Sequence, residues 1–341
     1  PRFRSRPVML MLTGAAAAAV VVASCGRSTS TATTGAAADA ASKVYVAPGQ
    51  YDEFYAFVSG GFSGNLPVYA LPSGRLLRDI PVFSQYPEKG WGYSEQTKAM
   101  LNTSYGFVPW DDAHHPELSQ TDGVPDGRWV FVNANNTPRV ARIDLTNMET
   151  MEILEVPNAA GNHSSPFVTM NTEYAVAGTR FSVPIPNADV SISEYKEKFS
   201  GTLTFIKVDK ATGRMSIAFQ LLMPGFDYDL AHAGKGPSHG WAFFTSYNSE
   251  QASTLLEKNA SQNDKDFIAA VNWKRAEECV AQGKATDLPS RYAHNVVGEG
   301  HIARTEFGTS VKLITPAQCE GVVYFLPTPK SPHGVDVNPS G

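Results

Sequence analysis

The stretch GRWVFVNANNTPRVARIDL, residues 127–145, contains two runs of β-branched and aromatic residues on either side of a polar segment. Such residues favour strands, and a segment rich in Asn with a Pro favours a turn. The stretch therefore predicts two antiparallel strands joined by a short connection. The next run, METMEILEVP at 148–157, adds a third strand to the pattern.

Similar strand-and-turn patterns recur along the chain. They are EFYAFVSG (53–60), LPVYALPSGRLLRDIPVF (66–83), EYAVAGTRFSVPI (173–185), GTLTFIKVDKATGRMSIAFQLL (201–222), GWAFFTSYNS (240–249) and GVVYFLPTPKSPHGVDV (321–337). Four-stranded repeats of about 40–50 residues build β-propellers. The pattern predicts an all-β fold, a propeller with long insertions at 84–128 and 251–310, and leaves an antiparallel sandwich as the alternative. Apolar spacing near 3.6 residues predicts one helix over 264–282.

Composition excludes several classes of protein. The chain has 341 residues, a net charge of −5 and a pI near 5.9. It has no stripe of Lys and Arg interleaved with aromatics, so nucleic acid is not expected as a partner. The length suits two ordinary domains or one large propeller.

The first 25 residues predict a targeting segment. Three arginines precede the apolar run PVMLMLTGAAAAAVVVA at 7–23, which is short for a membrane span and has signal-peptide flanks. The VASC sequence ending at Cys25 is similar to a bacterial lipobox. We expect export by the Sec route and membrane attachment through a lipid on Cys25; the alternative is an ordinary cleaved signal.

The residues after the targeting segment divide into two parts. Residues 26–43 are mostly Ser, Thr, Ala and Gly without large apolar side chains, which predicts a flexible tether. The folded part is expected over 44–341. Two further cysteines, Cys279 and Cys319, could pair; we expect buried, unpaired thiols, because a large domain needs no disulfide.

Four histidines lie in Gly-, Pro- or Asn-rich segments beside predicted strands: His114, His115, His163 and His333. Propeller loops converge on the axis, so these residues could meet there. Imidazoles without thiolates suit copper, zinc or nickel. Adjacent residues of a regular strand point to opposite faces, so His114 and His115 would not easily bind one ion. Two alternatives to a shared site remain: the histidines are exposed polar residues of loops, or His163 and His333 bind a single zinc ion in a hydrolase.

Oxygen donors cluster between residues 247 and 266. Tyr247, Glu250, Asp264 and Asp266 fall within 20 positions. Calcium binds carboxylates and carbonyls in irregular loops, although the EF-hand pattern is absent. The alternative is a solvated loop whose acidic residues cap the predicted helix.

Three motifs resemble nitrous-oxide reductase. They are WDDAHHPELSQTDGVPDGRWVFVNANNTPRVARIDL (110–145), TSYNSE (245–250) and SPHGVDV (331–337), and the similarity runs from about Tyr45 to the end. The family has an N-terminal seven-bladed β-propeller and a C-terminal cupredoxin domain. The resemblance implies that this chain is an N-terminal fragment: a signal segment, then a partial propeller with inserted loops and a short helix, without the cupredoxin domain.

The resemblance also implies cofactors. His114, His115, His163 and His333 match ligands of a four-copper sulfide cluster, and the other ligands and a dinuclear copper site would lie in missing residues. Adjacent histidines could then reach different copper atoms. Calcium is implied at five positions that match the family's site: Tyr247, Glu250, Lys258, Asp266 and Ser331. Lys258 and Ser331 differ from the residue types that the family has at these positions, and Asp264 is an alternative to Asp266.

The implied reaction is N2O + 2H+ + 2e− to N2 + H2O, the last step of denitrification, in the periplasm. The implied partners are nitrous oxide, a periplasmic electron donor such as a c-type cytochrome or cupredoxin, and a second copy of the full-length chain in a head-to-tail homodimer. The 341-residue fragment itself is expected to be inactive. The competing hypothesis is a metal-free exported propeller that binds a partner through its polar loops.

Overall fold

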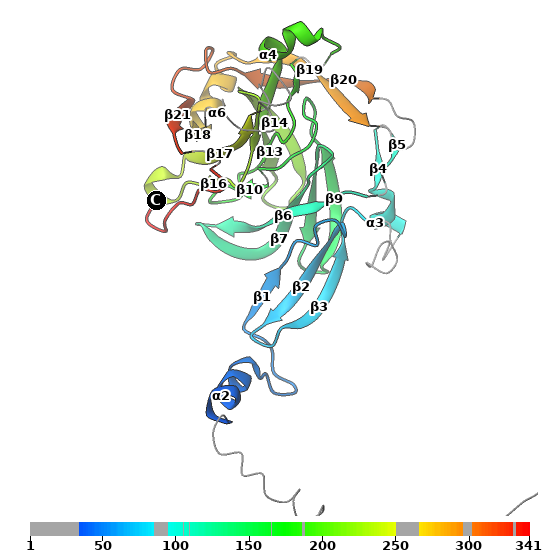
Figure 1. The fold of residues 1–341 in the computed structure, drawn as a ribbon, viewed down its shortest axis with the longest axis vertical. Coiled ribbons are helices and arrows are strands. Elements are labelled where there is room, and N and C mark those ends of the chain that lie inside the picture. Colours follow the sequence, from blue (N-terminus) through cyan, green and yellow to red (C-terminus); the bar gives the residue numbers. More distant parts are fainter. Residues whose placement is uncertain are drawn as a thin grey trace, which may run out of the picture. The chain divides into compact units, whose positions relative to one another are not determined.

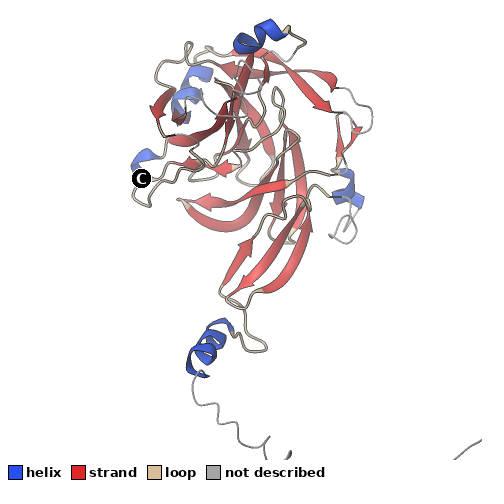
Figure 2. Cartoon of the chain, in the orientation of Figure 1, coloured by secondary structure: helices blue, strands red, loops and turns tan. Residues whose placement is uncertain are grey.

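A computed structural model describes residues 34–84, 95–104, 106–108, 110–164, 166–185, 188–249, 266–295, 302–329 and 332–341. Strands account for most of the secondary structure and helices are few and short (Figure 2). The prediction of a mostly β fold is thus confirmed. Within the described part of the chain, no helix combines the length and apolarity required to cross a membrane. The predicted signal segment, 1–25, lies outside the described residues.

The chain separates into two compact units, residues 1–54 with 70–74, and residues 55–69 with 75–341. The smaller unit contains α2 (Thr34–Val44). The end of the expected tether, 26–43, is therefore helical from Thr34, in keeping with its alanine content. The candidate site residues that the structure describes belong to the larger unit.

Successive strands form the first two sheets (Figure 1). The first has the order β1-β2-β3, with bounds Phe54–Phe57, Asn65–Leu71 and Arg75–Pro81. The second has the order β6-β7-β8-β9, with bounds Ala113–Thr121, Val124–Ala134, Arg139–Asp144 and Glu149–Glu155. The two runs of 127–145 pair as an antiparallel hairpin, as predicted, with Trp129 opposite Asp144. Along the chain, three short elements follow the first sheet and precede the second: α3 (Glu95–Ala99), β4 (Asn102–Thr103) and β5 (Gly106–Phe107). β4 and β5 pair with each other in a two-stranded sheet.

The third sheet has the order β10-β11-β13-β14-β20-β19, with β12 paired to β13. Its strands are Phe167–Val168, Tyr174–Gly178, Val183–Pro184, Phe199–Val208, Met215–Met223, Thr286–Asn295 and Ile302–Ile314. The fourth sheet has the order β15-β17-β18-β21, with β16 paired to β17. Its strands are Phe226–Tyr228, His232–Ala233, Trp241–Ser249, Phe267–Asn272 and Val323–Pro327. The remaining helical segments are η2 (Ile192–Glu194), α4 (Tyr195–Lys198), η3 (Gly236–Ser238) and α6 (Trp273–Ala281).

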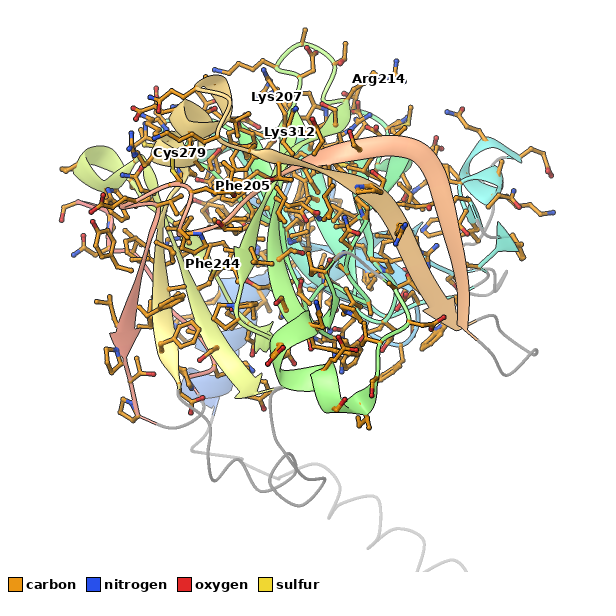
Figure 3. All side chains as sticks on the ribbon, turned by 90° about the horizontal axis from the view of Figure 1, so that it is seen from above. Phe205, Lys207, Arg214, Phe244, Cys279 and Lys312 are labelled. Atoms are coloured by element: carbon orange, nitrogen blue, oxygen red, sulfur yellow. A yellow bond between two sulfur atoms is a disulfide. The ribbon has the colours of Figure 1, made fainter. Side chains whose placement is uncertain are left out.

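Apolar side chains pack between each sheet and the next. In β7, Val130 and Val132 contact residues of the first sheet, whereas Trp129 and Phe131 contact residues of the third. In the third sheet, Phe205 packs toward the fourth, in the cluster that includes Phe244 (Figure 3). The middle sheets are therefore buried on both faces, because alternate side chains of a strand point to opposite sides. This explains why the sequence has continuous apolar runs instead of strict alternation.

Two local predictions are wrong. The segment 264–282 is not one helix: β18 occupies Phe267–Asn272, and α6 begins at Trp273, with the Asn272 side chain accepting a hydrogen bond from Arg275 N–H at 3.0 Å. The strand forms because FIAAVN pairs on both sides, with β17 and β21. Cys279 and Cys319 form a disulfide, because the sequence between them leaves and returns to the same place in the core.

Candidate metal centre

A β-bulge brings the adjacent histidines together. The pairing of β6 with β7 shifts in register between Ala113 and Pro116, at His114 and His115. An extra residue in one strand breaks the alternation of side chains. The two imidazole centroids are consequently 4.2 Å apart. The expectation that neighbouring side chains would point to opposite faces is wrong here.

His163 lies in the connection between β9 and β10. Its N–H donates to the carbonyl of Gly178 at 3.1 Å, and the Gly178 N–H donates to the Ser164 carbonyl at 3.1 Å. A Cβ on Gly178 would lie 2.7 Å from Ser164 Cβ, so the close pairing of this loop with β11 requires a glycine. The loop is thereby fixed to the third sheet.

One amide connects the two histidine-bearing segments. Asn133 of β7 is fully buried, and its Oδ1 accepts the N–H of His115 at 2.7 Å. Its Nδ2 donates to the carbonyl of Asn162, the residue before His163. Both segments are hydrogen-bonded to the Asn133 side chain, and β7, which carries it, belongs to the second sheet. The second sheet therefore sets the distance between the two segments.

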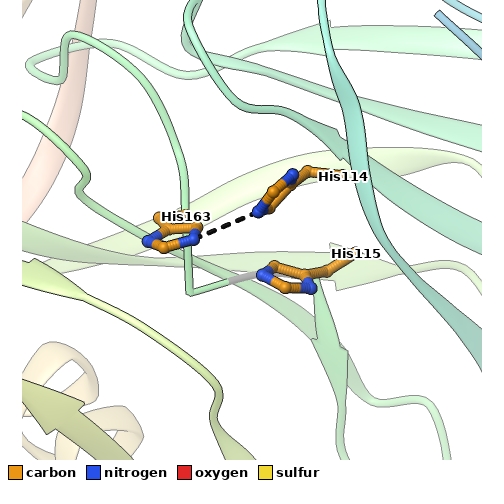
Figure 4. Close-up of side chains that lie close together, drawn as sticks. All are labelled: His114, His115 and His163. Atoms are coloured by element: carbon orange, nitrogen blue, oxygen red, sulfur yellow. Dashed lines mark hydrogen bonds between the residues drawn. The ribbon is translucent and has the colours of Figure 1, made fainter. Parts of the chain in front are cut away.

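The three imidazoles converge on one point (Figure 4). One ring nitrogen from each of His114, His115 and His163 lies within 4.8 Å of those of the other two. The Nε2 atoms of His114 and His163 are 3.2 Å apart. Convergent imidazole nitrogens at this spacing are what a transition-metal ion, or a small cluster of such ions, requires.

His333 joins the group through the carboxylate of Asp229. Leu230 and Gly334 form a parallel β-bridge, which sets Asp229 beside His333. His333 Nε2 is 3.2 Å from Asp229 Oδ2. The other carboxylate oxygen, Oδ1, is 3.4 Å from His163 Nε2 and 3.7 Å from His115 Nε2. The last histidine-bearing loop and the paired histidines thus face the same carboxylate.

Two further carboxylates orient the rings. His163 Nδ1 is 2.8 Å from Asp227 Oδ1, and His114 Nδ1 is 3.2 Å from Asp112 Oδ2. With each Nδ1–H donating to a carboxylate, each Nε2 presents a lone pair, which is the usual arrangement for a metal-binding histidine. Two such lone pairs facing each other at 3.2 Å need a proton or a cation between them.

Burial and charge set the protonation of the site. Burial alone would raise the pKa of Asp112 and Asp229, but hydrogen bonds to Asp112 and the charge of the imidazoles beside Asp229 outweigh it, so both pKa values are lowered. Burial raises the pKa of Asp227 despite its bond to His163. Burial lowers the pKa of His115, whose Nε2 is buried without a hydrogen-bond partner among the described residues. A neutral imidazole is the form that binds metal.

Of the five residues matched to a calcium site, the structure describes two. Tyr247 lies near the end of β17 and Asp266 immediately before β18, with Phe267 N–H donating to Ser246 Oγ between them at 2.9 Å. The Tyr247 ring lies 5.3 Å from that of His333 and 6.3 Å from that of His163, centroid to centroid. Glu250, Lys258 and Ser331, and the rival Asp264, lie outside the described residues.

Four residues of this centre have no signal in the sequence: Asp112, Asn133, Asp227 and Asp229. Asp112 is close to the paired histidines in the chain, but nothing marks it apart from Asp111. The two aspartates of the FDYD segment (226–229) become visible only when β15 and the bridge at Leu230 bring them to the histidines. Two other histidines are engaged elsewhere, His232 with Asp336 and His239 with Glu173.

Comparison with known proteins identifies relatives along the whole chain. The chain is 32% identical over 351 aligned residues to the nitrous-oxide reductase of Pseudomonas fluorescens, covering 100% of this chain and 50% of the relative. It is 30% identical over 300 residues to that of Stutzerimonas stutzeri, covering 88% and 43%. With that of Cupriavidus necator the identity is 28% over 319 residues, covering 89% and 45%. The chain spans about half the length of the curated relatives it matches.

Other comparisons add little. No family model matches the sequence. Among solved structures, hydrazine synthase of Kuenenia stuttgartiensis aligns with 81% of this chain and 80% of its own, at a TM-score of 0.39 and 11% identity. A similarity of that level carries no argument about function.

Proposed function

Because the chain is homologous to nitrous-oxide reductase along its whole length, we propose that it is part of an enzyme that reduces nitrous oxide to N2 and water, the last step of denitrification. In this proposal His114, His115, His163 and His333 are ligands of a four-copper sulfide cluster. The four larger sheets are part of a seven-bladed propeller whose other blades, together with a cupredoxin domain carrying a dinuclear copper site, belong to the full-length protein.

The observation that carries the proposal is the convergence of imidazoles from three distant segments of chain. His114 and His115, His163, and His333 are separated by 48 or more positions, yet all face Asp229 or one another within 3.7 Å. Isolated loop histidines on a protein surface have no reason to be collected in this way. The donor chemistry fits copper, since the ring nitrogens are free of thiolate competitors and two Nδ1 atoms are held by carboxylates.

When bound, the copper cluster would supply electrons to nitrous oxide, a weak ligand that is otherwise inert. The protein's own contribution is positional. Asp112 and Asp227 hold the Nδ1 protons, so that the Nε2 atoms of His114 and His163 stay directed at one point. Asn133 fixes the distance between their segments, which limits the rearrangement required when metal binds.

The same proposal covers location and partners. The Cys279–Cys319 disulfide supports export, because disulfides persist in oxidising compartments. We place the protein in the periplasm, attached through a lipid on Cys25, as a homodimer that receives electrons from a c-type cytochrome or cupredoxin. Calcium is proposed at Tyr247, Glu250, Lys258, Asp266 and Ser331.

Copper analysis of the full-length protein tests the proposal. Single substitutions His114→Ala, His115→Ala, His163→Ala and His333→Ala should each lower the copper bound per chain, whereas His239→Ala, whose ring nitrogen pairs with Glu173 at 2.8 Å, should not. A chain that folds and binds no metal would support a binding module instead. Zinc binding that survives loss of His114 or His115 would support a two-histidine hydrolase site. Turnover of nitrous oxide by the 341-residue chain with a chemical reductant would contradict the prediction that it is inactive alone.

A further inference from the structure

The segment that carries His333 buries little of its own surface. Residues 332–341 are half-buried or exposed along their whole length, and the His333 side chain itself is 63% exposed. A segment that buries no side chain gains little from the hydrophobic effect, so its position depends on hydrogen bonds to the rest of the protein. The direction of the His333 imidazole therefore depends on the residues that bind this backbone.

Two contacts hold the segment at His333 itself. The hydroxyl of the buried Thr245 in β17 donates to the His333 carbonyl at 3.3 Å. The next residue, Gly334, forms the parallel β-bridge with Leu230. Both contacts lie within one residue of His333, so they do not fix the residues that follow it.

His232 supplies a contact on the C-terminal side. It lies in β16, two positions after Leu230, and the parallel register of the bridge brings it beside residues 336 and 337. The Val337 N–H donates to His232 Nδ1 at 2.7 Å. Two N–H donors at that distance would repel each other, so Nδ1 carries the lone pair and the proton of the neutral ring is on Nε2.

Protonation of this ring would remove the contact. Asp336 Oδ1 lies 3.0 Å from the same Nδ1 and 2.9 Å from the same Val337 nitrogen, but its side chain is 90% exposed and so competes with water. Burial lowers the pKa of His232; the charge of Asp336 raises it and that of Lys235 lowers it. The contact is therefore complete above the ordinary value of 6.5 and is lost as the pH falls through the lower folded-state pKa.

We propose that neutral His232 is a positioning residue for the metal centre: by accepting the Val337 N–H it fixes the segment that carries His333 and keeps that imidazole directed at the proposed copper cluster. The inference rests on the proposed function, because it requires His333 to be a copper ligand. It adds a residue that touches no metal, and it makes the position of one ligand depend on pH.

Hydrogen–deuterium exchange of the full-length protein, followed by mass spectrometry of peptides that cover residues 332–341, tests the contact. His232→Ala should speed exchange of this segment by about three- to ten-fold, the effect of one lost hydrogen bond. His232→Asn should restore protection, because its Oδ1 can accept at the position of Nδ1. His239→Ala is the matched control, since its side chain is 22% exposed against 21% for His232 and also pairs with a carboxylate.

The pH profile separates this role from a purely structural one. After correction for intrinsic exchange rates, protection of the segment in the wild type should fall as the pH is lowered from about 7.5 to about 5. Protection in His232→Asn should not fall in this way, because an amide does not titrate. If His232→Ala does not fold, this comparison decides, and identical pH profiles of the two proteins would overturn the inference.

Copper loss to a chelator tests the consequence for the centre. The full-length His232→Ala protein should lose copper about ten-fold faster than the wild type, and His232→Asn should not, since residues that orient ligands change metal affinity by about 10–100-fold. Unchanged exchange of residues 332–341 in His232→Ala refutes the inference. Faster copper loss in His333→Ala but not in His232→Ala also refutes it and leaves the proposed function standing. Copper loss that is unchanged in both variants refutes the role of His333 in the proposed function as well.

Discussion

The amide of Asn133 makes the most specific prediction about how the centre is held. Replacement by leucine keeps the volume of the side chain nearly constant but removes both hydrogen bonds. The His115 N–H and the Asn162 carbonyl, which the amide now satisfies inside the protein, then lose that partner. Each buried polar group left unsatisfied costs about 1–3 kcal/mol, so the two together should lower the free energy of unfolding by about 2–6 kcal/mol.

Urea unfolding of the metal-free chain measures this loss. The total stability of a folded domain is about 5–15 kcal/mol, so the expected change is a large fraction of it. Gln282→Leu provides the control: this residue is exposed in the turn after α6, and its substitution should change stability by no more than about 0.5 kcal/mol.

A second measurement separates positioning from stability. If Asn133 sets the distance between the histidine-bearing segments, Asn133→Leu should also bind copper more weakly under conditions where the variant is still folded. A change in unfolding free energy below about 0.5 kcal/mol would refute the reasoning, because it would mean that neither backbone group depends on the amide.

Three further predictions concern the rest of the fold. Gly213→Ala should destabilise the protein more than Gly74→Ala. Both glycines have φ near +72°, but only a Cβ at position 213 would lie within 2.6 Å of Trp129. Equal decreases in the melting temperature of the two variants would exclude the clash. Replacing both disulfide cysteines by serine should lower the free energy of unfolding by roughly 4 kcal/mol, because the unfolded chain then regains the entropy of a loop of 40 residues. Urea unfolding of the oxidised wild type and of the variant measures this difference. Burial would raise the pKa of Asp126, but hydrogen bonds from Arg128 and neighbouring hydroxyls hold this pKa below 3.8. The ionised carboxylate therefore stabilises the fold above that pH, and this stabilisation is lost as the pH falls through the folded-state pKa. Asp126→Asn should lower the free energy of unfolding at pH 7 and have progressively less effect in strong acid.

Short sequence patterns were sufficient to predict elements that form between neighbouring parts of the chain. The two runs of 127–145 specify a hairpin, because β-branched and aromatic residues flank a turn, and this pairing is present. The histidines could be selected from their settings, and the motifs around them placed the chain among the right relatives. The segment 267–272 shows the limit: FIAAVN has acceptable helical spacing, and only the strands on both sides of it make it a strand.

The amino-acid sequence by itself determined the mostly β character of the protein, the identity of four candidate metal ligands and the relationship to nitrous-oxide reductase. The tertiary structure decided how these four side chains meet. A bulge in β6 turned two adjacent imidazoles to one side, and a bridge at Leu230 set Asp229 among the Nε2 atoms. The physical reason is that strand registers and the burial of single polar groups depend on contacts between residues that are distant in the sequence, such as Leu230 and Gly334, which no short pattern of side chains encodes.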